Sequence, residues 1–200
     1  MKTLVEQFPS QLSKAIEIGR SAKLKAAKNE IRNVLITGLG GSGIGGTIVS
    51  ELAFPECPVP VQVSKGYFIP SYTNANTLVI VSSYSGNTEE TLACMKQAFE
   101  KGATVCAITS GGAVEEFAKT NNLDYILIPG GMPPRSCLGY SLTQLIAILA
   151  HHKLISADHL SDIEKANALI LKKQDAIVVQ AKSIAEFLLG KIPVIYSTTL

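Results

Sequence analysis

Two short segments of this 200-residue chain combine small residues with hydroxyl side chains in a pattern that suits anion binding. The first reads Gly-Leu-Gly-Gly-Ser-Gly-Ile-Gly-Gly over residues 38–46, and the second reads Ser-Ser-Tyr-Ser-Gly-Asn-Thr over residues 82–88. Glycine lets a backbone approach a ligand closely, and hydroxyl groups donate hydrogen bonds without adding bulk. If a helix starts at each segment, its free N–H groups and its dipole also favour a negative charge.

The glycines at positions 38, 40 and 43 satisfy the G-x-G-x-x-G spacing of dinucleotide-binding proteins. That motif also needs an acidic residue about 20 positions further on to hold the ribose hydroxyls. Residues 61–65 stand at that place and read Val-Gln-Val-Ser-Lys, without a carboxylate, and we expect Lys65 to be a surface charge. The P-loop pattern fails as well, because no Gly-Lys-Ser or Gly-Lys-Thr follows the glycines. A dinucleotide-dependent oxidoreductase is therefore the less favoured alternative.

The second segment favours a compact phosphate monoester, because Ser83, Ser85 and Thr88 offer three hydroxyl groups within one short turn. A purely structural interpretation stands beside this one. Ser83, Ser85 or Asn87 could cap the following helix, and the glycines could simply form tight turns. Two such segments at one site favour ligand binding over the structural interpretation.

Arg135 lies in the sequence Gly-Gly-Met-Pro-Pro-Arg-Ser at residues 130–136. A single loop arginine is usually a solvated surface charge, although the two prolines restrict the backbone and could aim the side chain. The three histidines have no acidic or cysteine partner at the spacing of metal ligands. We therefore predict no metal site and no bound cofactor.

The elements that must position these residues follow from the apolar pattern. Short β-branched runs, several followed by glycine, serine or proline, predict buried parallel strands at residues 33–37, 59–63, 77–82, 104–109 and 125–128. Helical patterns predict helices over residues 9–30, 44–54, 88–101 and 113–120. This alternation predicts an α/β fold with a doubly wound, five-stranded parallel sheet in the order 2-1-3-4-5 and helices on both faces. In that order the first and third strands are neighbours, so both segments should face one crevice.

The pattern changes after residue 130. Apolar residues recur on one helix face at Leu142, Leu145, Ile146 and Leu149. A longer helical pattern covers residues 161–189, which is typical of a helix between domains or against another subunit, and residues 192–197 predict one more strand. We therefore predict three parts: a domain over residues 1–153, a helical linker over 154–190, and the first strand of a second domain over 191–200.

Composition excludes several classes of protein. Eighteen basic against sixteen acidic side chains give a formal net charge of +2, which argues against nucleic-acid or membrane partners. Hydrophobic residues make up 46% of the chain, so the chain is not disordered. We also expect part of its apolar surface to be covered by a second copy, as in a homodimer.

The four scattered cysteines suit a reducing compartment. No apolar run approaches the roughly 18 residues of a membrane span, and the charged start is unlike a secretory signal. We predict a cytoplasmic protein.

The pattern Ser-x-Ser-Gly-x-Thr from Ser83 to Thr88 resembles the phosphate-binding signature of the sugar-isomerase (SIS) domain family. The glycine-rich segment and the Pro-Pro-Arg sequence at residues 133–135 narrow the resemblance to the bifunctional phosphoglucose/phosphomannose isomerases of archaea and some bacteria. The resemblance covers essentially the whole chain. It implies a catalytic Arg135 that stabilises the enediolate or assists the proton shuttle. It also implies substrate-binding roles for Gly40, Gly41, Ser42, Ser83, Ser85 and Thr88.

This resemblance implies an aldose–ketose isomerase of hexose 6-phosphates that needs neither metal nor cofactor. Members of the family carry two SIS domains, and their catalytic glutamate, a ring-opening histidine and a further lysine lie in the second. The match ends at Leu200, before the position where the glutamate is expected. We therefore expect this chain to supply the binding half and to lack the catalytic base. A non-catalytic regulator that binds a sugar phosphate is the alternative of a different class.

Overall fold

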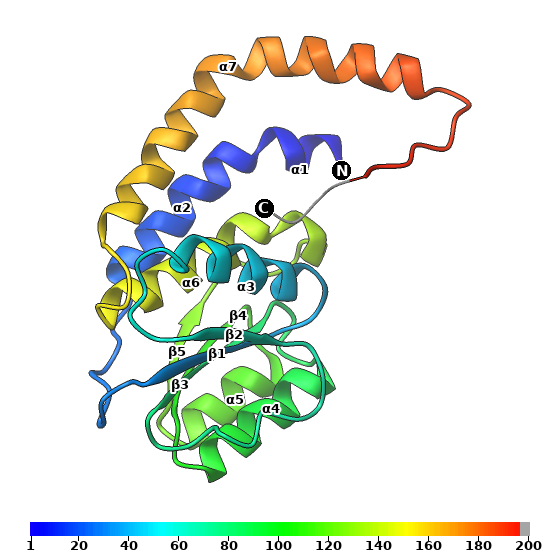
Figure 1. Cartoon of the computed structure of the whole chain (residues 1–200). Helices are drawn as coiled ribbons and strands as arrows, with labels where there is room; N and C mark the ends of the chain where they lie inside the picture. Colours follow the sequence, from blue (N-terminus) through cyan, green and yellow to red (C-terminus); the bar gives the residue numbers. More distant parts are fainter. Residues whose placement is uncertain (197–200) are drawn as a thin grey trace.

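The computed structural model describes residues 1–196, in which a five-stranded sheet lies between two layers of helices (Figure 1). All strands pair in parallel in the order β2-β1-β3-β4-β5, which confirms the predicted topology. The strands are β1 (Asn33–Thr37), β2 (Val61–Ser64), β3 (Thr77–Ser83), β4 (Thr104–Thr109) and β5 (Asp124–Leu127).

The helices differ in which face of the sheet they cover. α2, α3 and α6 pack on one face, and α4 and α5 pack on the other (Figure 1). Their bounds are α1 (Lys2–Glu6), α2 (Phe8–Ser21), α3 (Gly40–Ala53), α4 (Glu89–Glu100), α5 (Gly112–Thr120), α6 (Leu138–His151) and α7 (Asp158–Leu188), with a 3₁₀ turn η1 (Pro134–Ser136) before α6. Within the described chain no helix combines the length and the apolar character needed to span a membrane.

The strands divide their side chains between two apolar cores because successive residues of a strand point to opposite faces. In β1, Val34 and Ile36 belong to the core under α3 and α6, whereas Leu35 packs with Val79 and Val81 in the core under α4 and α5. β3 is buried along its whole length, as expected for the central strand of a sheet that is covered on both faces. This central strand ends at the second of the two segments.

The predicted helix over residues 9–30 is wrong in its second half, because α2 ends at Ser21. Residues 22–32 form neither helix nor strand and run along the amino ends of the strands. There the Lys25 N–H donates to Asp124 Oδ2 at 2.6 Å, and the Arg32 N–H donates to the Asn76 carbonyl at 2.8 Å. An extended chain spans about 3.3 Å per residue against about 1.5 Å in a helix. A helix over these residues would be too short to connect α2 with β1 along this path, so the segment is not helical despite its local helix propensity.

Two further differences concern the ends of elements. α3 begins at Gly40, earlier than the predicted residue 44, so Gly40 to Ser42 form its first turn. Residues 192–196 form no strand, which corrects the described part of the prediction over 192–197, and Ser197 lies outside the described residues. A strand is stable only when its backbone pairs with a neighbour, and no strand lies beside this segment among residues 1–196.

The first part of α7 packs on α2, and the rest of the helix extends into solvent. Arg20 of α2 holds Glu164 through two hydrogen bonds of 2.6 and 3.0 Å, and Asn167 Nδ2 donates to Ser13 Oγ at 3.0 Å. Further along, Val179 and Phe187 are about 70% exposed, and the helix extends away from the sheet (Figure 1). The first part of the predicted linker is therefore packed on α2.

Candidate functional site

The two small-residue segments lie side by side at the carboxyl ends of β1 and β3, as the strand order predicts. These strands are neighbours with Thr37 opposite Val81. The Tyr84 N–H donates to Ser42 Oγ at 3.3 Å, which joins the second segment to the first. A side chain at Gly38 would place its Cβ 2.7 Å from the Ser82 carbonyl oxygen. Only glycine permits this close approach of the two backbones.

The first turns of α3 and α4 keep backbone donors available for a ligand. Neither helix has a side-chain cap, and within residues 1–196 the N–H groups of Gly40, Gly41 and Thr88 have no hydrogen-bond acceptor. The interpretation of Asn87 as the cap of α4 is wrong. Its Oδ1 instead accepts a hydrogen bond from the Ala113 N–H, at 3.0 Å, at the start of α5. The first turn of each helix therefore offers N–H groups and the positive end of a helix dipole to an anion.

The three predicted hydroxyl groups differ in their accessibility. Ser83 is 2% exposed, and its Oγ donates to Thr88 Oγ1 at 3.2 Å, so this serine orients the threonine. Ser85 is exposed and Thr88 is half-buried. Ser85 Oγ also accepts the Asn87 N–H at 3.3 Å, which leaves its own hydrogen free to donate. Ser85 and Thr88 can therefore touch a phosphate, while Ser83 supports them.

A glycine closes the turn that carries these hydroxyls. Gly86 has φ +69°, and a Cβ there would lie 1.7 Å from the Gly111 carbonyl oxygen. The Gly86 carbonyl accepts the Val114 N–H at 2.9 Å. The turn after β3 is thus tied to the turn after β4, which limits its movement.

Arg135 lies in η1, beside the first turn of α3. A Cβ at Gly41 would be 3.3 Å from the Pro134 carbonyl oxygen and 3.8 Å from Arg135 Cα. The Arg135 side chain is exposed, and no carboxylate or carbonyl group among residues 1–196 pairs with its guanidinium. The predicted arginine is therefore placed next to the glycine-rich segment with its charge uncompensated.

Tyr84 supports the site in a way that the sequence patterns did not indicate. Its hydroxyl donates to the Pro129 carbonyl at 3.0 Å and accepts the Met132 N–H at 3.1 Å, so it holds the segment that leads to Arg135. Burial raises the pKa of this phenol from 10.0 to about 12, so the hydroxyl remains a donor well above neutral pH. The only signal in the sequence was a large aromatic residue between two serines.

Lys65 is exposed, as predicted for a surface charge, and it lies beside the glycine-rich segment. It directly follows β2, and its Cε lies 3.5 Å from the position that a Cβ on Gly43 would occupy. Its side chain is exposed and forms no ion pair with the described residues. Lys65 therefore adds positive charge at the carboxyl ends of the strands, whereas Glu89 and Glu90 in the first turn of α4 add negative charge.

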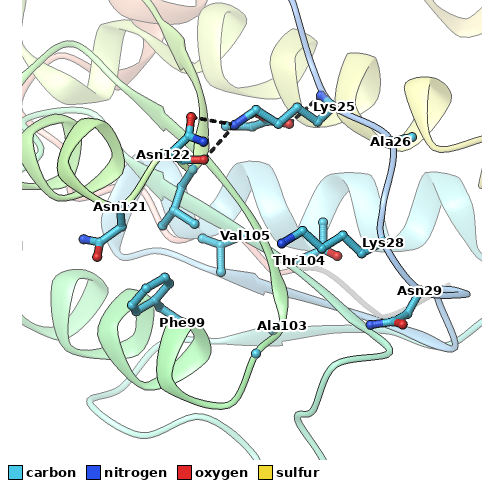
Figure 2. Close-up of a pocket in the computed structure, with 13 residues that line it drawn as sticks. Lys25, Ala26, Lys28, Asn29, Phe99, Ala103, Thr104, Val105, Asn121 and Asn122 are labelled. Atoms are coloured by element: carbon cyan, nitrogen blue, oxygen red, sulfur yellow. Dashed lines mark hydrogen bonds and ion pairs between the residues drawn. The ribbon is translucent and has the colours of Figure 1, made fainter.

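A cavity of about 310 Å³ lies at the other end of the strands (Figure 2). It is bordered by the extended segment through Lys25 and Lys28 and by Phe99, Val105 and Asn122. Lys25 Nζ donates to the Asn122 carbonyl at 2.7 Å and to its Oδ1 at 3.0 Å. Because β4 and β5 begin at this cavity, it is separate from the two turns at their carboxyl edge. Among the described residues, no cluster of three or more His, Cys, Asp or Glu side chains could hold a metal ion.

Several known proteins are similar to this chain over most of its length. No family model matches the chain. It is 39% identical over 198 residues to a bifunctional phosphoglucose/phosphomannose isomerase of Caldicellulosiruptor bescii, with 96% of this chain and 58% of that protein covered. It is 40% identical over 191 residues to the protein of the same name from Thermoplasma acidophilum, with 90% and 57% covered. The chain thus spans somewhat more than half the length of these relatives.

The solved structures agree on the fold. A Clostridium difficile 630 protein, provisionally named a phosphosugar isomerase, superposes with a TM-score of 0.73 at 21% identity, covering 94% of this chain and 56% of that one. The predicted resemblance is confirmed by the relatives, and the SIS-type fold is confirmed by this superposition and the strand order.

Proposed function

We propose that this chain provides the phosphate- and sugar-binding half of an aldose–ketose isomerase, which interconverts glucose 6-phosphate or mannose 6-phosphate with fructose 6-phosphate. The observation that carries the proposal is the pair of helix N-termini joined by the Ser42–Tyr84 hydrogen bond. The N–H groups of Gly40, Gly41 and Thr88 have no acceptor there within the described residues. The identity of about 40% to isomerases of this name supports the choice of reaction.

The proposed reaction moves one proton between C1 and C2 of the open-chain sugar through a cis-enediol. The phosphate lies far from these carbons, so its binding energy anchors and orients the substrate. Ser85, Thr88 and the first turn of α4 hold the phosphate in this scheme. Gly40, Gly41 and Ser42 contact the sugar, and Arg135 stabilises the negative charge that develops on the oxygens.

The reaction also needs a base for the C1 or C2 proton. Glu89 and Glu90 directly follow the phosphate turn, but as part of the first turn of α4 they stabilise that helix end. We therefore place the base outside these 200 residues, in the part of the relatives that this chain does not cover. In this scheme the 200-residue chain binds its substrate but turns it over poorly.

Titration calorimetry with fructose 6-phosphate and 6-phosphogluconate tests the proposal. We expect saturable binding of both sugars, competition by inorganic phosphate, and little conversion in a coupled assay for glucose 6-phosphate. Absence of binding would refute the proposed site, and full turnover would show that the base is misplaced. Binding of NADH with comparable affinity, measured by fluorescence titration, would favour the dinucleotide-dependent alternative.

We also propose that the chain acts as a homodimer in the cytoplasm. The exposed apolar side chains of α7, such as Val179 and Phe187, support a covered surface, and the four free cysteines suit a reducing compartment. Sedimentation at micromolar concentration tests the assembly, and a monomer there contradicts it.

A further inference from the structure

Two glutamine side chains are buried where α2 packs on α6, and each lies over a glycine of the opposite helix. Gln11 of α2 is 7% exposed, and a Cβ on Gly139 of α6 would lie 2.6 Å from its Oε1. Gln144 of α6 is 0% exposed, and a Cβ on Gly19 of α2 would lie 3.2 Å from its Oε1. Each pair thus places a buried glutamine of one helix over a glycine of the other, within the same α2–α6 interface.

The two buried amides donate to different kinds of acceptor. Gln144 Nε2 donates to the Ala15 carbonyl at 2.8 Å, which lies inside α2. Gln11 Nε2 donates to the Ser136 carbonyl at 2.7 Å, which belongs to η1, the turn that carries Arg135. Gln144 therefore joins two helices, whereas Gln11 joins a helix to the candidate active-site turn.

We propose that Gln11 is a positioning residue that holds Arg135 in place against the glycine-rich segment, an inference that rests on the proposed function. A 3₁₀ turn of three residues has little stability of its own. Here it is fastened on both sides, at Met132 by the Tyr84 hydroxyl and at Ser136 by Gln11. Arg135 stands between these two anchors, and its exposed side chain has no other partner among residues 1–196 to fix it.

Gln11 Oε1 is buried and accepts no hydrogen bond within the described residues, and the same is true of Gln144 Oε1. An apolar side chain of similar volume would avoid the cost of burying such an oxygen at either position. The role of Gln11 therefore rests on the partner of its amide N–H and not on this cost. The feature that only glutamine provides is the donor to the Ser136 carbonyl, whereas packing alone could be served by methionine.

The test compares Gln11→Met with Gln144→Met, because both variants remove one buried amide from the same helix interface. Trypsin under native conditions reports the freedom of η1 directly, since the peptide bond after Arg135 is cleaved only when the turn opens. We expect cleavage after Arg135 to become about fivefold to tenfold faster in Gln11→Met. In Gln144→Met the rate of cleavage at this bond should stay within about twofold of the unsubstituted chain.

Binding of fructose 6-phosphate is the second readout. Gln11→Met should weaken it by about threefold or more, and Gln144→Met should not. Equal cleavage rates in the two variants would overturn the role of Gln11. If the unsubstituted chain does not bind the sugar, the proposed function fails, while the cleavage rates still decide whether Gln11 holds the turn.

A second pair of variants covers the case in which Gln11→Met does not fold. Gly139→Ala places a methyl group 2.6 Å from Gln11 Oε1 and 3.0 Å from Phe8 Cε2. Gly19→Ala places one 3.1 Å from Ala147 Cβ and 3.2 Å from Gln144 Oε1, which makes it the control for crowding in the same helix interface. We expect faster cleavage after Arg135 in Gly139→Ala alone. The inference would be contradicted if Gly139→Ala left the rate of cleavage unchanged. It would also be contradicted if Gly139→Ala and Gly19→Ala accelerated cleavage equally.

Discussion

The backbone N–H of Tyr84 donates to the Oγ of Ser42 at 3.3 Å, and this single bond joins the turn after β1 to the turn after β3. Both turns lead into helices whose first N–H groups have no protein acceptor among residues 1–196. The β1–β3 ladder already places the two turns side by side, and the bond adds a direct link that helps to fix the separation of the two donor sets. A phosphate held at one turn is then at a defined position relative to the other.

The hydroxyl groups of the second turn should dominate phosphate affinity. Replacing both Ser85 and Thr88, as Ser85→Ala with Thr88→Val, should weaken fructose 6-phosphate binding at least about tenfold, because hydrogen bonds to a charged group are each worth about 1.5–3 kcal/mol. Calorimetry measures the change. Thr120→Val, at the exposed far end of α5, is the matched control and should leave affinity unchanged. Unchanged affinity in the double variant would exclude these hydroxyls from the site.

The close packing of Gly41 on η1 predicts a second effect. Gly41→Ala places a Cβ 3.3 Å from the Pro134 carbonyl, so η1 and Arg135 must shift by a few tenths of an ångström. We expect weaker sugar binding with little change in thermal stability, since the turn is at the surface. Gly66→Ala is the control, because a Cβ there meets no atom within 4 Å. A variant of Gly41 that binds as well as the Gly66 variant would show that this packing does not position Arg135.

Lys65 should act through its charge. Lys65→Met should weaken fructose 6-phosphate binding several-fold at low salt, and the difference should fade as the Debye length falls from about 30 Å at 0.01 M to about 3 Å at 1 M salt. Titrations at several salt concentrations measure this. Lys23→Met, on the extended segment at the opposite sheet edge, removes the same formal charge and should have a smaller effect. Equal effects from the two lysines would argue for net charge alone.

The phenol of Tyr84 predicts a loss of stability in alkali. Its pKa is raised from 10.0 to about 12, first because burial disfavours the phenolate. The folded chain therefore holds this proton more tightly than the unfolded chain. Its contribution is complete below pH 10 and is lost as pH rises toward 12. Tyr84→Phe should show a shallower fall in the free energy of unfolding over this range, measured by urea titration.

The same variant has an effect at neutral pH that serves as its check. Tyr84→Phe loses the bond to the Pro129 carbonyl and leaves the Met132 N–H without its acceptor, which should cost about 1–3 kcal/mol. Burial also raises the pKa of Tyr140, so part of the alkaline slope should persist in Tyr84→Phe. An identical slope in the variant and the unsubstituted chain would mean that Tyr84 does not carry this linkage.

The fold was predictable where local pattern and topology agree. Val34 to Ile36 and their counterparts in β3 and β4 are apolar β-branched runs that end at small residues, and the rule for parallel sheets then places the two turns together. Residues 22–30 were predicted to be helical and are not. Their composition favours a helix, but the path from α2 to β1 requires an extended chain.

The supporting contacts of the site were less accessible to sequence reasoning. Gln11 and Ser136 are 125 residues apart, and no spacing rule connects them. Ser83 has the same residue type as Ser85, yet the structure buries the first and exposes the second. Sequence patterns identify which residue types can meet a phosphate, but only the packed backbone determines which of them reach solvent.

The extended segment over residues 22–32 makes the amino-terminal part of the chain inseparable from the rest. It attaches α2 to the entry points of β5 and β1, and α2 in turn fastens the arginine turn through Gln11. Deleting residues 1–32 would expose the face of α6 that packs on α2, and it would remove the segment that lines one side of the cavity in Figure 2. Removal of these residues should therefore impair sugar binding, because the arginine turn loses the support of Gln11.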